Sequence, residues 1–402
     1  MTNPKLALIP SGYKGGANPT VYSILPNDGS GDFTFSRTGE ATRVRKDGLI
    51  EKVTDDIPRL DWLNSDCPSL KLEPQRTNET TYSEDYTQTS YWNNVIDVVA
   101  TKDVAVAPNG TFTANKIQAN SGTNFKILRK GAFTIPSGVT MSMFVKRGNH
   151  DYIIFKAQGD YSFNLSTLTW GGSYSNVGYE DYGNDWIRLY ATTTSSDLSY
   201  FGIYLTDSSF NQSWTATGNE FVYVWGGQYE VGDYVSSYIK SNIGGTTTRL
   251  KDECLLGGDG NLFNISEGTF FVDANNFGAP YLGYSMITLS NGSTNFIRFI
   301  YESSRIRTSV ENGTSQQDYF ITGVNDNERN KVAITFKQNE FKVYHNGVLK
   351  DTDLIGVVPT GFVRLDFASQ SGASRHFEGK VYDTRVYDRV LTEAEAIELT
   401  QV

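Results

Sequence analysis

Short runs in which apolar and polar residues alternate recur along most of the chain. A period of two is typical of strands that bury one face. In the central part such runs lie between turns rich in Gly, Asn, Asp and Ser, at residues 140–146, 152–156, 186–192, 200–205 and 220–226. Repeated short strands with turn signals between them predict a β-sandwich of the jelly-roll type.

The last third of the chain repeats this pattern and predicts a second sandwich. A hairpin is expected where the strands 331–337 and 340–345 meet, and Asn346-Gly347 predicts a tight turn with positive φ at both central residues. Thr392 followed by Glu395 forms a capping-box pattern, so a short helix is expected at residues 392–400.

The first 80 residues differ from the rest of the chain. Phe33 and Phe35 alternate with polar residues, but Pro58, Pro68 and Pro74 limit regular sheet because each removes a hydrogen-bond donor. We therefore predict an extended N-terminal arm, expect its removal (residues 1–60) to leave two folded sandwiches, and interpret the polar residues 239–248 as a linker. The predicted domains are the arm at 1–80, a sandwich at 81–250 and a second sandwich at 251–402.

Composition supports an all-β protein: two jelly-roll sandwiches preceded by the extended arm, with one short C-terminal helix. A chain of 402 residues has room for two or three domains at roughly 150 residues each. Aromatic residues reach 13% and glycines number 38, while charged residues are only 20%, a balance that favours strands over helix bundles. The cysteines, Cys67 and Cys254, lie far apart, which indicates a reducing compartment without a disulfide framework.

Net charge and hydropathy exclude several classes of partner. The formal charge of −10 argues against unaided binding to nucleic acid or to an anionic membrane. No apolar run approaches the roughly 20 residues that span a bilayer, and the apolar stretch at the N-terminus is too short for a signal peptide. We expect synthesis in the cytoplasm and no membrane insertion.

Catalytic patterns are missing from the sequence. It contains no Gly-x-Ser-x-Gly, His-Glu-x-x-His or Cys-x-x-Cys motif, and His150, His345 and His376 stand in unrelated contexts. We predict no catalytic residue and no enzymatic activity. Since Asp and Glu are plentiful and no pair stands out, a polysaccharide-degrading enzyme stays open as the alternative.

Two acidic, glycine-rich loops bear on metal binding. Residues 28–32 (Asp-Gly-Ser-Gly-Asp) and 257–261 (Gly-Gly-Asp-Gly-Asn) cluster oxygen ligands, yet neither matches a calcium-binding EF-hand loop. Turn formation is the favoured interpretation. We predict no cofactor and no metal ligand, with a structural calcium ion as the alternative.

Aromatic residues in polar segments are candidates for glycan binding, because aromatic rings can stack on the apolar faces of sugars. Trp214 lies in a polar segment between strands and is the first candidate, with Trp170, Tyr174 and Tyr179 second. A subunit contact is the alternative role for Trp214. The tryptophans expected in the core are Trp92, Trp186 and Trp225.

Two resemblances add to this. Residues 331–347 and 377–392 resemble a laminin-G/concanavalin-like jelly roll, whose last strand is followed by a short capped helix. Motifs earlier in the chain resemble tailed-bacteriophage virion structural proteins, described as fibre, spike or carbohydrate-binding-like. This resemblance implies that the sandwich at 81–250 is similar to a carbohydrate-binding module. These motifs keep one order along the chain, with Lys71 where that group usually has Leu, and lie at residues 8–14, 31–37, 41–44, 47–51, 58–61, 67–78, 82–85, 181–188 and 226–232.

The resemblance implies a virion surface protein, a tail or head fibre, spike or decoration component, that presents its sandwiches for attachment to host-surface glycan. Its expected partners are other virion proteins and copies of itself, as a homotrimer by analogy with phage fibres. The N-terminal arm is the expected docking element. A purely structural virion adaptor without a ligand is a further alternative, and the choice between head and tail stays open.

Overall fold

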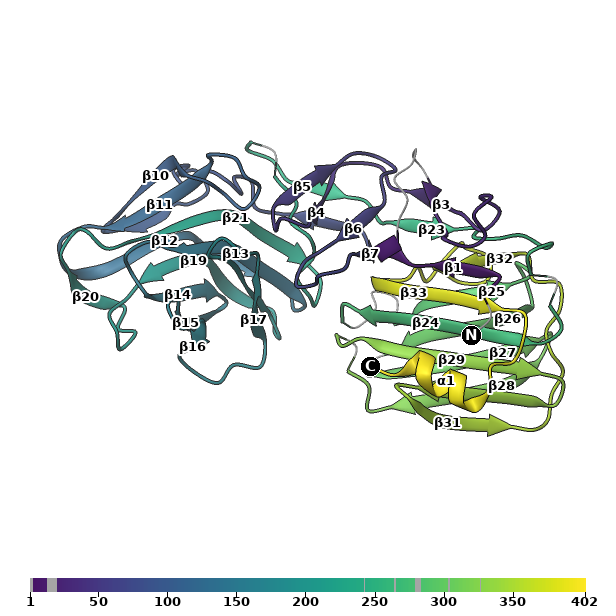
Figure 1. Ribbon diagram of the computed structural model, residues 1–402. Coiled ribbons are helices and arrows are strands. Elements are labelled where there is room, and N and C mark those ends of the chain that lie inside the picture. The colour runs from purple at the N-terminus through teal and green to yellow at the C-terminus, as the bar shows by residue number, and fades with distance from the viewer. Residues whose placement is uncertain are drawn as a thin grey trace.

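The computed structural model describes residues 3–12, 20–241, 243–263, 265–278, 283–302, 304–325 and 327–402. Two β-sandwiches lie side by side, and short strands from the N-terminal segment lie between them (Figure 1). The predicted all-β class is confirmed, together with a single short α-helix near the C-terminus of the described chain. None of the described helices combines the length and hydropathy needed to cross a membrane.

The central sandwich packs two antiparallel sheets face to face. One sheet has the order β10-β11-β21-β13-β18-β17, and the other has the order β16-β15-β14-β19-β12-β20 with β9 beside β12. Trp92, Phe155 and Phe201 lie fully buried between them. The strands are β9 (Asn94–Ile96), β10 (Val98–Ala105), β11 (Ala114–Ala119), β12 (Gly122–Ile135), β13 (Val139–Arg147), β14 (Tyr152–Ala157), β15 (Gly159–Asn164), β16 (Thr169–Trp170), β17 (Val177–Asp181), β18 (Trp186–Thr192), β19 (Asp197–Leu205), β20 (Ser213–Ala216) and β21 (Phe221–Val231).

The C-terminal sandwich is built in the same way. Its larger sheet has the order β31-β30-β29-β24-β33-β7-β6 with β1 beside β33, and it faces the sheet β28-β27-β26-β25-β32. Its strands from the C-terminal part are β24 (Gly268–Asn276), β25 (Ser285–Ser290), β26 (Asn295–Glu302), β27 (Arg305–Asn312), β28 (Ser315–Thr322), β29 (Asn330–Lys337), β30 (Glu340–His345), β31 (Val348–Asp353), β32 (Arg364–Asp366) and β33 (Gly379–Tyr387).

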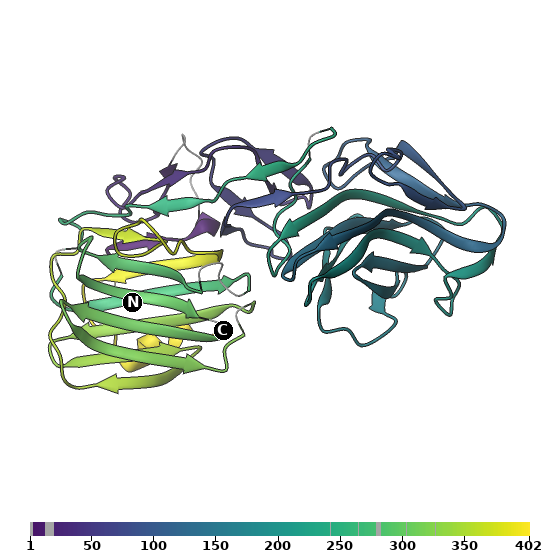
Figure 2. The same ribbon diagram turned by 180° about the vertical axis from the view of Figure 1, so that it is seen from behind.

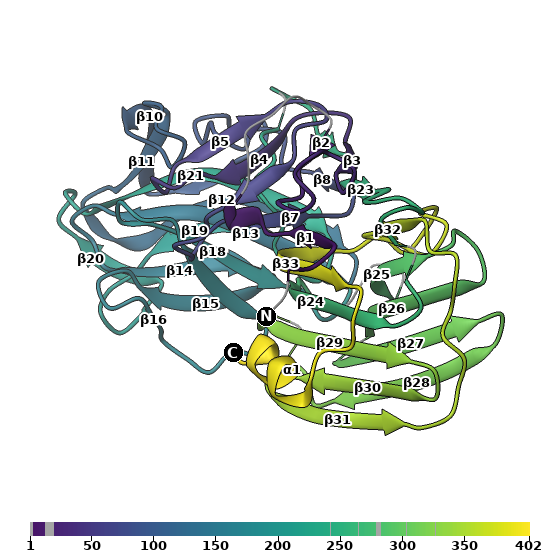
Figure 3. The same cartoon turned by 45° about the vertical axis from the view of Figure 1, so that its right-hand side comes forward.

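Local sequence patterns in this sandwich form the structures predicted from them. Strands β29 and β30 form the expected hairpin, and Asn346 and Gly347 take φ values of 47° and 77° in the turn to β31. Helix α1 (Glu393–Thr400) begins with the predicted capping box between Thr392 and Glu395. The helix lies on the outer face of the larger sheet, where its Ala396 and Leu399 contact a small buried cluster (Figure 3).

The N-terminal segment is extended, as expected, but it does not stand apart as an arm. Strands β1 (Leu6–Leu8), β6 (Arg59–Asp61) and β7 (Ser69–Leu72) belong to the larger C-terminal sheet. The side chains of Leu6, Leu8, Leu70 and Leu72 are buried in the core of that sandwich. This segment has too few apolar residues for a core of its own, so it buries them against a domain that is distant in sequence.

The rest of the segment bridges the two sandwiches (Figure 2). Val44 and Ile50 cover the outer face of the central sandwich around the buried Trp186 and Trp225. The bridging strands are β2 (Thr20–Val21), β3 (Phe33–Ser36), β4 (Ala41–Val44), β5 (Ile50–Val53), β8 (Arg76–Asn78), β22 (Thr247–Arg249) and β23 (Glu253–Leu255), with β3 pairing β2 and β23, β4 pairing β5, and β8 pairing β22.

The predicted linker at 239–248 packs with the bridging strands and contains the start of one of them. Ile239 is buried, and β22 begins at Thr247. Asn242 lies outside the described residues, as do Tyr13 and Lys14 of the motif at 8–14. The linker therefore crosses between the sandwiches as part of a packed junction.

Candidate functional site: an aromatic cluster on the central sandwich

Three of the four predicted aromatic residues meet at one side of the central sandwich. Trp170 and Tyr179 flank Phe163, with ring centroids 4.8 Å and 5.7 Å from it. Tyr174 lies 6.0 Å from Trp170 and 5.1 Å from Tyr161. We call Tyr161, Phe163, Trp170, Tyr174 and Tyr179 the aromatic cluster.

The sequence places these rings by strand pairing at the sandwich edge. Phe163 of β15 is directly opposite Trp170 of β16, which brings their rings together. Gly171 and Gly172 follow at once, and a Cβ on Gly171 would approach the Phe210 ring to 2.6 Å. A side chain at position 171 would therefore require the Phe210 ring to shift.

The cluster combines apolar rings with polar groups, which is the chemistry that sugars require. Phe163 is fully buried, Trp170 and Tyr174 are half-buried, and Tyr179 is 39% exposed. The Tyr174 hydroxyl accepts a hydrogen bond from the Ser162 backbone N–H at 3.3 Å. Exposed ring faces beside hydroxyl groups can stack on a sugar and hydrogen-bond to its substituents.

Trp214, the first candidate from the sequence, lies outside the aromatic cluster. Its strand β20 pairs with β12, and its indole Nε1 donates to the Leu205 carbonyl at 2.9 Å. Its ring stacks on His150 at 5.3 Å and an angle of 10°. Burial lowers the pKa of His150 below its ordinary value. Like Trp170 and Tyr174, this half-buried indole packs against the sandwich core.

Sequence reasoning missed a second group of polar and aromatic side chains on the outer face of the β12-β19-β14 sheet. The Arg129 guanidinium lies 3.9 Å from the Tyr200 ring centroid, and Lys156 Nζ lies 5.5 Å from the same ring. Arg129 also donates to the Tyr204 hydroxyl, and burial raises the pKa of that hydroxyl to about 12. In the sequence, charged and apolar residues alternate within each of these strands. This alternation does not reveal which strands pair, so it could not show that these side chains lie together.

Aspartate side chains of the two acidic loops accept backbone hydrogen bonds from residues of the same or a neighbouring segment. Asp28 Oδ1 accepts from the Ser30 N–H at 2.9 Å, and Asp32 Oδ1 accepts from the Ser23 N–H at 2.8 Å. Asp259 Oδ1 accepts from the backbone of Asn261 at 2.8 Å. Within the described ranges, no group of three or more His, Cys, Asp or Glu side chains is placed to hold a metal ion.

The three histidines lie in separate places. His150 stacks on Trp214, while His345 Nε2 lies 2.9 Å from Asn330 Oδ1 and has its pKa lowered to about 4 by burial and by Lys350. His376 Nε2 lies 3.4 Å from Glu253.

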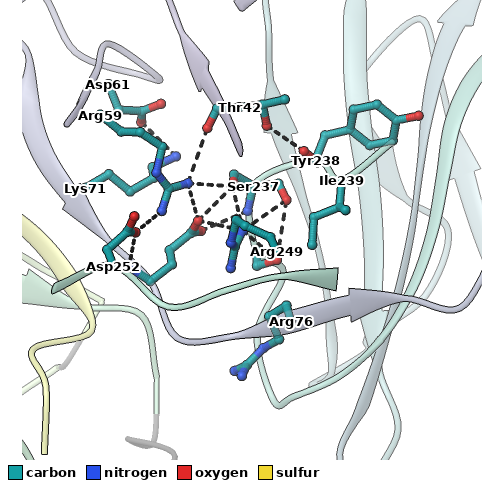
Figure 4. A network of polar contacts seen from close by, with 12 residues as sticks. Thr42, Arg59, Asp61, Lys71, Arg76, Ser237, Tyr238, Ile239, Arg249 and Asp252 are labelled. Carbon is teal, nitrogen blue, oxygen red and sulfur yellow. Dashed lines mark hydrogen bonds and ion pairs between the residues drawn. The ribbon is translucent and has the colours of Figure 1, made fainter. Parts of the chain in front are cut away.

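Many residues of the predicted virion motifs meet in a buried ion network at the junction between the sandwiches (Figure 4). Arg59 donates to both Glu73 and Asp252. Arg249 pairs with Glu73 at 2.8 Å, and Arg37 pairs with Asp252 at 3.0 Å. We call these five residues the junction network. All five side chains are at most 2% exposed.

The electrostatics of this network depend on complete pairing. Burial alone would raise the pKa of Glu73, but Arg249, Arg59 and Lys71 more than offset it and hold the pKa well below its ordinary value. Lys71, the departure from the group's leucine, pairs with the buried Asp61 at 3.0 Å. Arg37, Arg59 and Glu73 of the motifs that suggested a virion protein therefore lie in the junction network, whereas the aromatic cluster contains no residue of those motifs.

Comparison with known proteins agrees with the fold of the C-terminal sandwich. Residues 272–396 match the concanavalin A-like lectin/glucanases superfamily. The match covers the C-terminal sandwich, where a laminin-G/concanavalin-like jelly roll was predicted. No curated protein matches the chain.

Solved structures show only weak similarity. The CBM40 domain of the Ruminococcus gnavus IT-sialidase, bound to α2,3-sialyllactose, is 16% identical over 35% of this chain and 85% of its own, with a TM-score of 0.31. The NanB sialidase of Streptococcus pneumoniae is 12% identical over 35% of this chain and 25% of its own, with a TM-score of 0.29. A heptameric SAP-like pentraxin of Limulus polyphemus is 12% identical over 34% of this chain and 70% of its own, with a TM-score of 0.28. Similarity at this level does not extend to function.

Proposed function

We propose that this protein is a surface component of a tailed-phage virion, a fibre, spike or decoration protein, whose central sandwich binds host-surface glycan through the aromatic cluster. One observation carries the binding proposal: Trp170, Tyr174 and Tyr179 converge with partly exposed rings beside hydroxyl groups. The virion proposal is supported by the motifs that resemble virion structural proteins in a fixed order.

The junction network fits a protein that presents a binding surface. Charged side chains from the N-terminal segment and from the stretch after the linker are buried together, so the sandwiches are joined over a packed interface. A shallow aromatic surface gives weak binding to one sugar. Several copies on one particle would raise the overall affinity by avidity.

The binding proposal is tested with the purified chain on an array of bacterial surface polysaccharides. Tyr179→Ala and Trp170→Ala are each expected to weaken binding about two- to tenfold, because an aromatic contact contributes roughly 0.5–1.5 kcal/mol. Phe320→Ala is the matched control, since Phe320 is exposed to a similar extent (37%) but lies on the C-terminal sandwich. Equal binding by all three variants and the parent chain would refute the aromatic cluster as the site.

The virion proposal has its own test. Particles from the phage that encodes this chain are purified and analysed by mass spectrometry and by immunogold labelling. The chain is expected on the particle surface in a fixed copy number. Its absence from purified particles would refute the virion role without affecting the glycan test.

A further inference from the structure

A cavity of about 480 Å³ lies at the junction between the two sandwiches. Its walls come from four parts of the chain: residues 73–77 and Glu79 of the N-terminal segment, Val231 of the central sandwich, Lys251 and Asp252 after the linker, and Tyr284 with residues 373–378 of the C-terminal sandwich. The volume is within the range of small-molecule sites, which often lie between domains.

Arg76 is the buried cation in the wall of this cavity. Its side chain is 4% exposed, and Figure 4 shows it turned away from the junction network. Within the described part of the chain, its guanidinium makes one hydrogen bond, from Nη1 to the Gln75 carbonyl at 3.2 Å, while Nε makes no hydrogen bond and the guanidinium carbon lies 4.9 Å from the Tyr234 ring centroid. The paired carboxylate, Glu230, is 3.9 Å away. Burying a guanidinium with so few hydrogen-bond acceptors costs free energy. The lack of acceptors around Arg76 therefore needs an explanation.

Arg375 is a second arginine in the wall of the cavity. Arg375 is exposed, lies 4.9 Å from the Tyr284 ring centroid, and has no ion pair among the residues that the structure describes. By contrast, the carboxylates of Glu73 and Asp252 are already paired with the arginines of the junction network. Arg76 and Arg375 are therefore the arginines of the wall with spare hydrogen-bond donors. The third cation of the wall, Lys251, is paired with Glu253 at 2.6 Å.

The remaining wall residues can recognise hydroxyl groups. Glu79 and Glu378 line the same cavity, and a carboxylate oxygen accepts hydrogen bonds from hydroxyls. Tyr284 adds an aromatic ring that is 37% exposed. A cavity with arginines, carboxylates and an aromatic ring suits a ligand that carries both an anionic group and several hydroxyls.

We propose that this cavity binds a small hydroxylated carboxylate of the uronic acid class, with Arg76 and Arg375 holding its carboxylate. The planar guanidinium matches carboxylate geometry, and its hydrogen bonds to an anion are stronger than those to a neutral acceptor. The site is separate from the aromatic cluster and does not rest on the proposed glycan-binding function. Its ligand would contact both the N-terminal segment and the C-terminal sandwich.

Titration calorimetry of the full chain with sodium D-glucuronate tests the proposal. Methyl D-glucoside is the neutral comparison, and inorganic phosphate is the anion without the sugar ring. Glucuronate is expected to bind, and the other two probes are expected to bind at least tenfold more weakly. No binding of glucuronate, or equal binding of any of the other probes, would overturn the proposal.

Variants assign the binding to the two arginines. Arg375→Ala and Arg76→Gln are each expected to weaken glucuronate binding at least tenfold. Arg305→Ala, which removes an exposed arginine elsewhere on the C-terminal sandwich, is the control and should bind like the parent chain. Circular dichroism checks that Arg76→Gln is folded. If Arg76→Gln does not fold, the Arg375→Ala variant decides the outcome, because Arg375 is exposed. Unchanged binding by Arg375→Ala would overturn the assignment.

Discussion

At the scale of single residues, the junction network makes stability depend on complete charge pairing. Glu73→Gln removes the carboxylate that Arg59 and Arg249 share. We expect a loss of about 3–5 kcal/mol in the free energy of unfolding at pH 7, because breaking a buried ion pair leaves a charge without its partner. Denaturant unfolding measures this loss. Glu51→Gln, which removes one partner of a partly exposed pair with Arg43, is the control and should cost less than about 1 kcal/mol.

The same residue predicts a pH dependence. The cations around Glu73 lower its pKa in the folded state below its ordinary value near 4.5. Its charge therefore stabilises the fold above about pH 4.5, and this contribution is lost as the pH falls through the folded-state pKa. The difference in stability between the parent chain and Glu73→Gln should shrink from pH 5 downward. A difference that stays constant to the acid unfolding limit would contradict this.

Lys71 provides a second test at this scale. Its partner Asp61 is also 3.3 Å from Lys380 and accepts a hydrogen bond from the Val44 N–H at 2.9 Å. Lys71→Leu should therefore cost less than about 1 kcal/mol, since Asp61 keeps one cation. Adding Lys380→Met removes both cations and should cost about 3–5 kcal/mol more. Calorimetric melting of the two variants compares them; equal stability would show that Asp61 does not need a cation.

At the scale of elements, strand β1 connects the start of the chain to the C-terminal sandwich. Leu6 and Leu8 are at most 1% exposed and pack in its core. Leu6→Ala should lower the free energy of unfolding by about 2–5 kcal/mol, the usual cost of a cavity in a core. Leu354→Ala, on an exposed loop, is the control and should be close to neutral.

Removing residues 1–60 should destabilise the C-terminal sandwich, in contrast to the expectation for a free arm. An unchanged melting transition after that deletion would contradict the observed pairing of β1 with β33.

Elements whose signals are local could be predicted from the sequence, whereas those that depend on distant partners could not. The β29–β30 hairpin, the Asn346-Gly347 turn and the capping box each rest on neighbouring residues. Strand β1 pairs with β33 at the other end of the chain, and no local pattern reveals that partner. The same limit applies to the sites: Trp170 and Tyr179 stand close in sequence, but Arg76 and Arg375 come together only through the fold.

At the scale of the whole molecule, the buried junction predicts that the two sandwiches move as one body. A network of buried charges offers few alternative arrangements, because any shift leaves a charge without a partner. Spin labels at Ser166→Cys and Gln338→Cys, on exposed positions of the two sandwiches, can measure this by pulsed electron resonance. The exposed Cys67 is changed to Ser in this experiment, and Cys254 is buried.

The expected result is a narrow distance distribution in the parent chain that broadens in Glu73→Gln. A rigid junction has a direct consequence for binding, because avidity between copies on one surface is lost where geometry prevents them from engaging together. Glu73→Gln should therefore weaken binding of an oligomer to a glycan-coated surface while leaving binding of a soluble sugar at the aromatic cluster unchanged. A broad distribution in the parent chain would show that the sandwiches turn independently and that the junction does not fix how the aromatic cluster is presented.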